Sequence, residues 1–262
     1  MDLGIRGRKA IVNGGSAGLG KAGALALARE GVELVISARG EERLLSACAE
    51  IARETGVSVT PVVADHSTEE GRSAVLAACP APDILVSTCS PPPMTPDRRT
   101  ITADHWRESL DTGLLSPVWF IEATIDGMAE RGWGRIVNIA SGAVKYPHEL
   151  RILSGAPRAA LVNYSVAVSK AVAARNVTIN TLLPVMHHTA GIHAVYAQAA
   201  ARNGTTLEEE LRKAVETMRI PAGRFGNADD FGAFVALFCS EFANYVTGQS
   251  LVIDGGVATS LL

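Results

Sequence analysis

Glycines dominate one short stretch near the N-terminus, which reads Asn13-Gly14-Gly15-Ser16-Ala17-Gly18-Leu19-Gly20. Gly14 allows a tight turn, Gly18 lets backbone N–H groups approach a ligand, and Gly20 lets a following helix pack closely on a strand. A helix N-terminus offers unpaired N–H groups and the positive end of the helix dipole, and both favour negative charge. These residue types at this spacing predict a binding site for a pyrophosphate.

The segments around the glycines have to form a strand and a helix for this site to exist. The apolar run Lys9–Val12 comes before them, an Ala- and Leu-rich helical segment follows and ends at Gly31, and a second apolar run covers Val32–Ile36. Together they have the length of about thirty residues that a strand-helix-strand crossover needs. The alternative is a glycine turn that only packs a helix on a strand.

The G-x-x-x-G-x-G spacing resembles the fingerprint T-G-x-x-x-G-x-G of the short-chain dehydrogenase/reductase family, with Asn13 in place of its Thr. The resemblance implies an α/β fold with a Rossmann-type, doubly wound parallel sheet in three layers, forming a single domain over residues 1–262. It also implies a nicotinamide cofactor and oxidoreduction of a small-molecule carbonyl or alcohol substrate. The cofactor contacts that it implies here are Asn13, Gly14, Ser16, Gly18, Leu19 and Gly20.

The end of the second apolar run should distinguish between the two nicotinamide cofactors. An enzyme selective for NAD usually has an acid there for the ribose 2′-hydroxyl, whereas this chain has Ala38 followed by Arg39. We therefore expect NADP(H) to be preferred over NAD(H), with Ser37 and Arg39 flanking the 2′-phosphate and the guanidinium forming a forked pair. The alternative is that Arg39 is a solvated charge that pairs with Glu41 or Glu42.

Alternating apolar and amphipathic segments continue along the chain and predict a parallel sheet covered on both faces. The resemblance places Asp65 beside the adenine amino group, although this residue could instead cap the helix that starts near Thr68. It also places Gly113 where the family has an active-site Asn. The expected helices are 41–54, 68–78, 104–130 and 154–175, and the expected strands are 57–63, 84–88, 135–139 and 178–183.

The family's Tyr-x-x-x-Lys motif is missing from this chain. Counting back from Asn180 puts Ser154 at the position of the Tyr and Arg158 at the position of the Lys, and Ser141 matches the family's Ser. A serine hydroxyl titrates far above the pKa of about 10 of a phenol, and an arginine cannot give up its proton. Ser154 and Arg158 therefore preserve cofactor binding better than proton transfer.

Another group has to supply the proton if the protein is a reductase. Lys145, buried beside the cofactor with a depressed pKa, is the provisional donor, and Tyr146 is the second choice. The alternative is that both lie on a solvated loop. Ser141-x-x-x-Lys145 and Ser154-x-x-x-Arg158 resemble a divergent branch of the family for which 3-oxoacyl substrates are one option.

The segment 187–221 is long enough to form a substrate lid with helices over 192–202 and 207–218. The resemblance assigns Thr189 to the carboxamide of the nicotinamide. His187, His188 and His193 lie in the same region, where no carboxylate or cysteine stands at ligand spacing. We expect these histidines to line the substrate pocket and expect no metal site.

Bulk properties exclude several other classes of protein. The net charge of −3 and the isoelectric point of about 6.1 offer no basic surface for nucleic acid or anionic membranes. The scattered cysteines, the charged N-terminus and the lack of a long apolar run are typical of a cytoplasmic protein. The resemblance implies a homodimer or homotetramer that associates through the two long helices over 104–130 and 154–175.

Two functions remain open at this point. The preferred hypothesis is an atypical reductase in which Ser141 polarises the substrate oxygen and Arg158 holds the cofactor ribose. The alternative is a catalytically silent NADP(H)-binding protein that acts as a sensor or scaffold, which the missing Tyr, Lys and Asn would favour.

Overall fold

Seven parallel strands form one sheet in the computed structural model, which describes residues 1–258. The spatial order of the strands is β3-β2-β1-β4-β5-β6-β9, so the chain reverses direction across the sheet between β1 and β4. In such sheets ligands bind at this switch point, outside the carboxyl ends of the strands. The strands are β1 (Lys9–Asn13), β2 (Glu33–Ala38), β3 (Val59–Val63), β4 (Ile84–Ser87), β5 (Gly134–Ile139), β6 (Val177–Pro184) and β9 (Ser250–Ile253).

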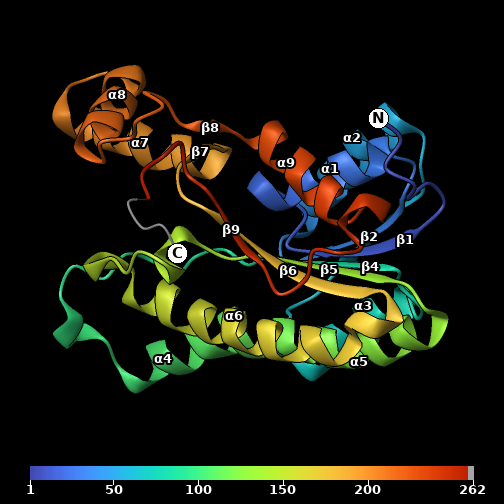
Figure 1. Cartoon of the computed structure of the whole chain (residues 1–262). Coiled ribbons are helices and arrows are strands. Elements are labelled where there is room, and N and C mark those ends of the chain that lie inside the picture. Colours follow the sequence, from blue (N-terminus) through green and yellow to red (C-terminus); the bar gives the residue numbers. More distant parts are fainter. Residues whose placement is uncertain (259–262) are drawn as a thin grey trace.

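Helices cover both faces of the sheet, as Figure 1 shows. Alternate residues of a strand point to opposite faces, so Ala10 and Val12 of β1 belong to one apolar core while Ile11 belongs to the other. The predicted three-layer α/β fold is therefore confirmed. One face carries α1 (Gly18–Arg29), α2 (Glu41–Thr55) and α9 (Ala228–Phe238), and the other carries α3 (Glu69–Ala78), α4 (Ala103–Leu110), α5 (Ser116–Arg131) and α6 (Ile152–Val172).

The predicted helix over 104–130 is interrupted. A π-helical turn at Asp111–Leu115 separates α4 from α5. Gly113 lies within this turn against α6, where a Cβ atom would stand 3.2 Å from Cβ of Pro157. The interruption therefore lies where a neighbouring helix packs closely.

The segment after β6 forms a separate small unit beyond the end of the sheet (Figure 1). It contains β7 (His187–His188), α7 (Ala190–Asn203), α8 (Leu207–Thr217) and β8 (Gly226–Asn227), and it has its own apolar cluster around Ile220 and Phe225. The helix α9 that follows was not predicted, although Asn227 caps it and two aspartates lie in its first turn. None of the helices in the described chain is long and apolar enough to cross a membrane.

Candidate active site

The glycine turn after β1 leaves no room for a side chain at Gly14 or at Gly20. Gly14 has a φ of +76°, and its N–H donates to the carbonyl oxygen of Ser37 at 2.8 Å. A Cβ atom on Gly14 would lie 2.5 Å from the carbonyl oxygen of Thr88, and one on Gly20 would lie 2.4 Å from that of Gly14. The predicted roles of these two glycines in a tight turn and close helix packing agree with this geometry.

The N-terminus of α1 is left open for an anion. Its N-cap residue, Ala17, supplies no side-chain acceptor, and its first turn contains no acid, whereas Thr189 and Thr206 cap α7 and α8. Free N–H groups at this helix end fit the pyrophosphate of a dinucleotide. The Cγ2 atom of Thr189 lies 3.6 Å from the position of a Cβ on Gly18, so the start of α7 lies beside the turn.

Two other residues predicted to bind the cofactor surround this turn. Ser16 is buried, at 5% exposure. Leu19 is partly buried and packs against the apolar core beneath α1. The stretch from Asn13 to Gly20 therefore lies at the carboxyl end of β1, which is inside the sheet.

Ser37 was expected to flank the 2′-phosphate, but its side chain is fully buried. Its hydroxyl donates to Oδ1 of Asn13 at 2.7 Å and lies 2.8 Å from Nε2 of His66. Asn13 and Ser37 are paired in the register of β1 and β2, which puts both side chains on one face of the sheet. The side chain of Ser37 therefore braces the strands and is not available to flank a 2′-phosphate.

Arg39 is exposed at the end of β2, as expected for a residue that meets the ribose. It forms no ion pair with Glu41 or Glu42, so within residues 1–258 the structure does not favour the alternative of a paired surface charge. Its positive charge lowers the pKa of Asp65 and of His66. The charge of Arg39 therefore acts on the residues that follow β3.

His66 lies beside Ser37, and the sequence analysis gave it no role. It packs edge-on against Phe120, with 5.6 Å between the ring centroids. Its pKa is lowered to about 4, mainly by burial, with Asp65 opposing the shift and Arg39 and Arg72 adding to it, so the ring is neutral at neutral pH. The only signal in the sequence was its place directly after Asp65 at the end of a predicted strand.

Asp65 is partly buried beside the expected adenine position. Its Oδ1 accepts hydrogen bonds from the backbone N–H of Ser67 at 3.0 Å and from the Ser67 hydroxyl at 2.7 Å, and these bonds lower the pKa of the carboxyl group. Thr68, not Asp65, caps α3 by accepting from the N–H of Gly71. The capping alternative for Asp65 is therefore wrong.

Arg158 and Ser154 meet on the face of α6 that is turned toward the end of β4. The Arg158 side chain is buried, and its Nη1 donates to the carbonyl oxygen and to Oγ of Ser154 at 3.0 Å and 3.1 Å. Its Nη2 donates to the carbonyl oxygen of Cys89 at 3.3 Å and contacts Sγ at 3.0 Å. Gly113 lies opposite, since a Cβ there would be 3.8 Å from Nη1. The structure thus brings together the positions matched to the family's Tyr, Lys and Asn.

Ser141 follows β5 and lies at the start of a short 3-10 helix, η3 (Gly142–Val144), where its hydroxyl accepts from the N–H of Ala143 at 3.2 Å. Lys145 corrects another expectation. This side chain is exposed at the end of η3, so it is not buried beside the cofactor. Tyr146 is partly buried one residue further on.

The three histidines of the predicted lid segment do not act as one group. His187 is buried edge-on against Phe231 in the main body of the protein, and burial lowers its pKa. His188 and His193 instead pair with each other, with 3.0 Å between Nδ1 and Nε2. In the part of the chain that the structure describes, no three His, Cys, Asp or Glu side chains gather as metal ligands would.

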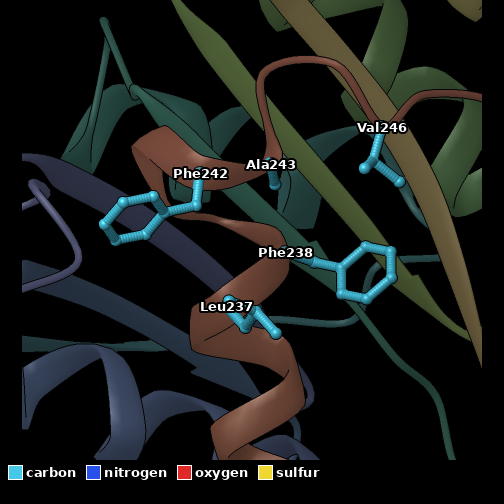
Figure 2. Close-up of a pocket in the computed structure, with 5 residues that line it drawn as sticks. All are labelled: Leu237, Phe238, Phe242, Ala243 and Val246. Carbon is cyan, nitrogen blue, oxygen red and sulfur yellow. The ribbon is translucent and has the colours of Figure 1, made fainter. Parts of the chain in front are cut away.

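An apolar pocket elsewhere on the surface does not belong to this site. Figure 2 shows it between the end of α9 and the residues that follow, lined by Leu237, Phe238, Phe242, Ala243 and Val246. The neighbouring Glu241 accepts a hydrogen bond from Trp133, which directly precedes β5, whereas Ser141 follows that strand. The pocket therefore lies toward the amino edge of the sheet and contains no titratable side chain.

Comparison with known proteins agrees with the fold. A family model described as Enoyl-(Acyl carrier protein) reductase matches residues 14–258. The chain is 27% identical to the 3-oxoacyl-(acyl-carrier-protein) reductase FabG of Aquifex aeolicus over 98% of its length and 100% of that protein. It is 30% identical to the NADPH-dependent reductase BacG of Bacillus subtilis, covering 97% and 99% of the two chains. The L-sorbose reductase of Gluconobacter frateurii, solved with NADPH and L-sorbose, matches over the full length of both chains with a TM-score of 0.94 and 27% identity.

These matches and the geometry define a Rossmann-type oxidoreductase that uses a nicotinamide cofactor. The chain belongs to the short-chain dehydrogenase/reductase family, as its glycine spacing predicted. Enzymes of this family interconvert small-molecule carbonyl groups and alcohols, and the prediction of this enzyme class is confirmed.

Proposed function

We propose that this protein is an NADP(H)-dependent reductase that transfers hydride between the cofactor and a small carbonyl or alcohol substrate, with a rebuilt catalytic group in place of the family's Tyr and Lys. The observation that supports this proposal most strongly is the buried contact between Ser154 and Arg158, at the positions of the missing motif. A buried cation at this place keeps positive charge beside the reacting atoms.

Preference for NADP(H) over NAD(H) is supported by Arg39 and by the absence of an acid at position 38. A guanidinium can bind a 2′-phosphate through two parallel hydrogen bonds, whereas the 2′-hydroxyl of NAD(H) offers it far less. Asp65, whose carboxyl group stays ionised, accepts a hydrogen bond from the adenine amino group in this proposal. Thr189, at the start of α7, contacts the carboxamide of the nicotinamide.

The bound dinucleotide supplies the hydride, and the chain's own residues orient and polarise the substrate. Ser141 donates a hydrogen bond to the substrate oxygen. Ser154 receives a hydrogen bond from Arg158, which leaves its own O–H free to donate to the same oxygen. Arg158 binds the ribose hydroxyls and stabilises negative charge that develops on that oxygen. Lys145, which is exposed, is removed from this mechanism. Hydride addition leaves an alkoxide, which takes its proton from the Ser154 hydroxyl while that hydroxyl is reprotonated by solvent water.

The segment 187–221 acts in this proposal as a substrate lid. Apart from His187, which packs on Phe231, it packs around its own small apolar cluster, which suits a unit that moves over the substrate. The proposed assembly is a homodimer or homotetramer through the long helices on the lower face in Figure 1. Trp119 and Leu115, at 51% and 38% exposure, give that face an apolar surface to cover.

The experiment is a screen for NADPH oxidation with ketone substrates, including L-sorbose and 3-oxoacyl thioesters. Ser141→Ala should lower turnover about 100-fold or more while leaving the affinity for NADPH unchanged, as expected for a donor to a developing oxyanion. Ser46→Ala, on the exposed side of α2, serves as the matched control. Equal turnover by wild type and Ser141→Ala would contradict the assigned role of Ser141.

The second candidate function is a catalytically silent NADP(H)-binding sensor or scaffold. The observation in its favour is that Lys145, the provisional proton donor, lies exposed on the surface. Tight binding of NADPH without turnover of any ketone or alcohol in the screen would favour this function over the reductase.

A further inference from the structure

Cys89 connects the side chain of Arg158 to the sheet. It lies two residues after the end of β4 and is partly buried. Its carbonyl oxygen and its Sγ both accept from Nη2 of Arg158, at 3.3 Å and 3.0 Å, while Nη1 donates to the carbonyl oxygen and to Oγ of Ser154 on α6. The guanidinium therefore bridges a helix and the end of a strand, and Cys89 holds it on the strand side.

Hydrogen bonds alone hold this guanidinium within the described part of the chain. Arg158 is only 3% exposed, yet it takes part in no ion pair among residues 1–258. The fully buried Arg135, by contrast, lies 3.8 Å from a carboxylate oxygen of Glu241. A buried cation without an acidic partner is stabilised by the hydrogen-bond acceptors around it. The acceptors that Cys89 supplies are therefore important for Arg158.

The contacts of Arg158 fix the orientation of its guanidinium plane. A guanidinium has five N–H donors, two on each Nη atom and one on Nε. Two acceptors at Nη1 and two at Nη2 occupy both ends of the group before any ligand binds. Of these four acceptors, only Oγ of Ser154 and Sγ of Cys89 belong to side chains. Removing Sγ would leave one Nη2 donor without an acceptor and let the plane rotate away from Ser154.

We propose that Cys89 is a positioning residue, which holds Nη2 of Arg158 so that Nη1 stays on Ser154 and keeps the Ser154 hydroxyl directed at the substrate oxygen. This inference rests on the proposed function and adds a residue to it. In this role Cys89 acts through Arg158 and not on the substrate. A guanidinium that is already oriented needs no rearrangement when negative charge develops in the transition state, so its orientation affects the rate.

The test removes the Sγ acceptor in ways that separate hydrogen bonding from packing. Cys89→Ala deletes the sulfur, Cys89→Val fills its space with methyl groups that cannot accept, and Cys89→Ser supplies a hydroxyl acceptor. Cys48→Ala is the control, because Cys48 is also a buried cysteine but packs beneath α2 on the opposite face of the sheet from α6. The constants kcat and KM are measured with NADPH and the best substrate of the screen, and NADPH affinity is measured by calorimetry.

Cys89→Ala and Cys89→Val should lower kcat roughly 5- to 20-fold, the effect of losing one weak acceptor for a charged donor, while KM and NADPH affinity change less than about threefold. Cys89→Ser should keep kcat within about threefold of wild type, and Cys48→Ala within about twofold. Arg158→Gln should lower kcat by itself. In that background Cys89→Ala should cause no further fall in kcat, because Cys89 acts only through Arg158.

Three results would overturn the positioning role while leaving the reductase intact. These are unchanged kcat in Cys89→Ala and Cys89→Val, no recovery in Cys89→Ser, or an undiminished further loss when Cys89→Ala is added to Arg158→Gln. If no substrate is turned over, the proposed function fails, and urea denaturation of wild type, the two single variants and the double variant still decides whether Cys89 holds Arg158. A smaller loss of stability from Cys89→Ala in the Arg158→Gln background than in wild type would support the contact, and equal losses would overturn it.

Discussion

The two ends of the proposed dinucleotide site differ in how closely they keep the family pattern. At the adenosine end, Gly14 and Gly20 have no room for a side chain, and α1 begins without a side-chain cap. At the nicotinamide end, Ser154, Arg158 and Gly113 occupy the places of the family's Tyr, Lys and Asn. Backbone geometry leaves few alternatives in a phosphate-binding turn, whereas a charge beside a ribose can be supplied by more than one side chain.

This contrast has a physical cause at each end. In the glycine turn a single methyl group would meet a carbonyl oxygen at 2.4 or 2.5 Å, which no side-chain rotation can relieve. At the other end the longer Arg158 side chain reaches both Ser154 and Cys89, and Gly113 leaves space beside it. The replacements at the nicotinamide end therefore contact one another and form one rearranged group of residues.

The largest expected effect comes from adding a methyl group to the glycine turn. Gly20→Ala should weaken NADPH binding about 100-fold or more and lower the free energy of unfolding by about 1–3 kcal/mol, because the turn has to open. Calorimetric titration and urea denaturation measure the two effects. Gly191→Ala is the control, since a Cβ there meets nothing within 4 Å. Unchanged NADPH affinity in Gly20→Ala would contradict the claim that the glycine turn has no room for a side chain when the cofactor is bound.

Arg39→Ala should weaken NADPH binding roughly 10- to 100-fold, the effect of losing charge-assisted hydrogen bonds to a phosphate. Its affinity for NADH should not change, because NADH has no 2′-phosphate. Fluorescence titration with both cofactors provides the measurement, and Arg53→Ala, exposed near the other end of α2, is the control. An equal loss for NADPH and NADH would show that Arg39 acts on the structure and does not read the phosphate.

His66 should make the adenosine end sensitive to acid. Its pKa falls to about 4 on folding, below the ordinary value of 6.5. The unfolded chain therefore takes up a proton as the pH drops through 6.5, which the folded protein does not do until about pH 4. Between pH 7 and pH 5 this residue should cost about 2 kcal/mol of stability.

Urea denaturation at both pH values measures this cost, and His66→Gln isolates it from the other titrating groups. The glutamine keeps a hydrogen-bonding side chain near Ser37 but does not titrate. The variant should therefore lose less stability than wild type between pH 7 and pH 5. Parallel losses in the two proteins would show that His66 is not a buried neutral residue.

The smallest expected effect is at Lys145. Because this side chain is exposed, Lys145→Ala should leave kcat and KM within about twofold of wild type. Steady-state kinetics with any substrate from the screen provides the measurement. A large fall in kcat would return Lys145 to the mechanism and would mean that the loop after η3 rearranges when substrate binds.

The sequence predicted the elements whose pattern is local and missed features that depend on contacts between elements. The strands around the glycine turn and the helices of the lid segment follow from apolar periodicity, and their observed bounds differ by a few residues at most. The π-helical turn at Gly113 packs against Pro157 of another helix. The burial of Ser37 depends on strand register, and Lys145 is exposed at the end of η3. None of these can be read from a single segment.

The central claim is that the chain keeps a dinucleotide site with a guanidinium at its adenosine end while its catalytic group is rebuilt. Calorimetric titration of NADPH and NADH into the wild-type protein and into Ser141→Ala tests it most directly. The account predicts one NADPH bound per chain, at least about tenfold tighter than NADH, with the same affinity in both proteins. No binding of either cofactor to the wild type would contradict it.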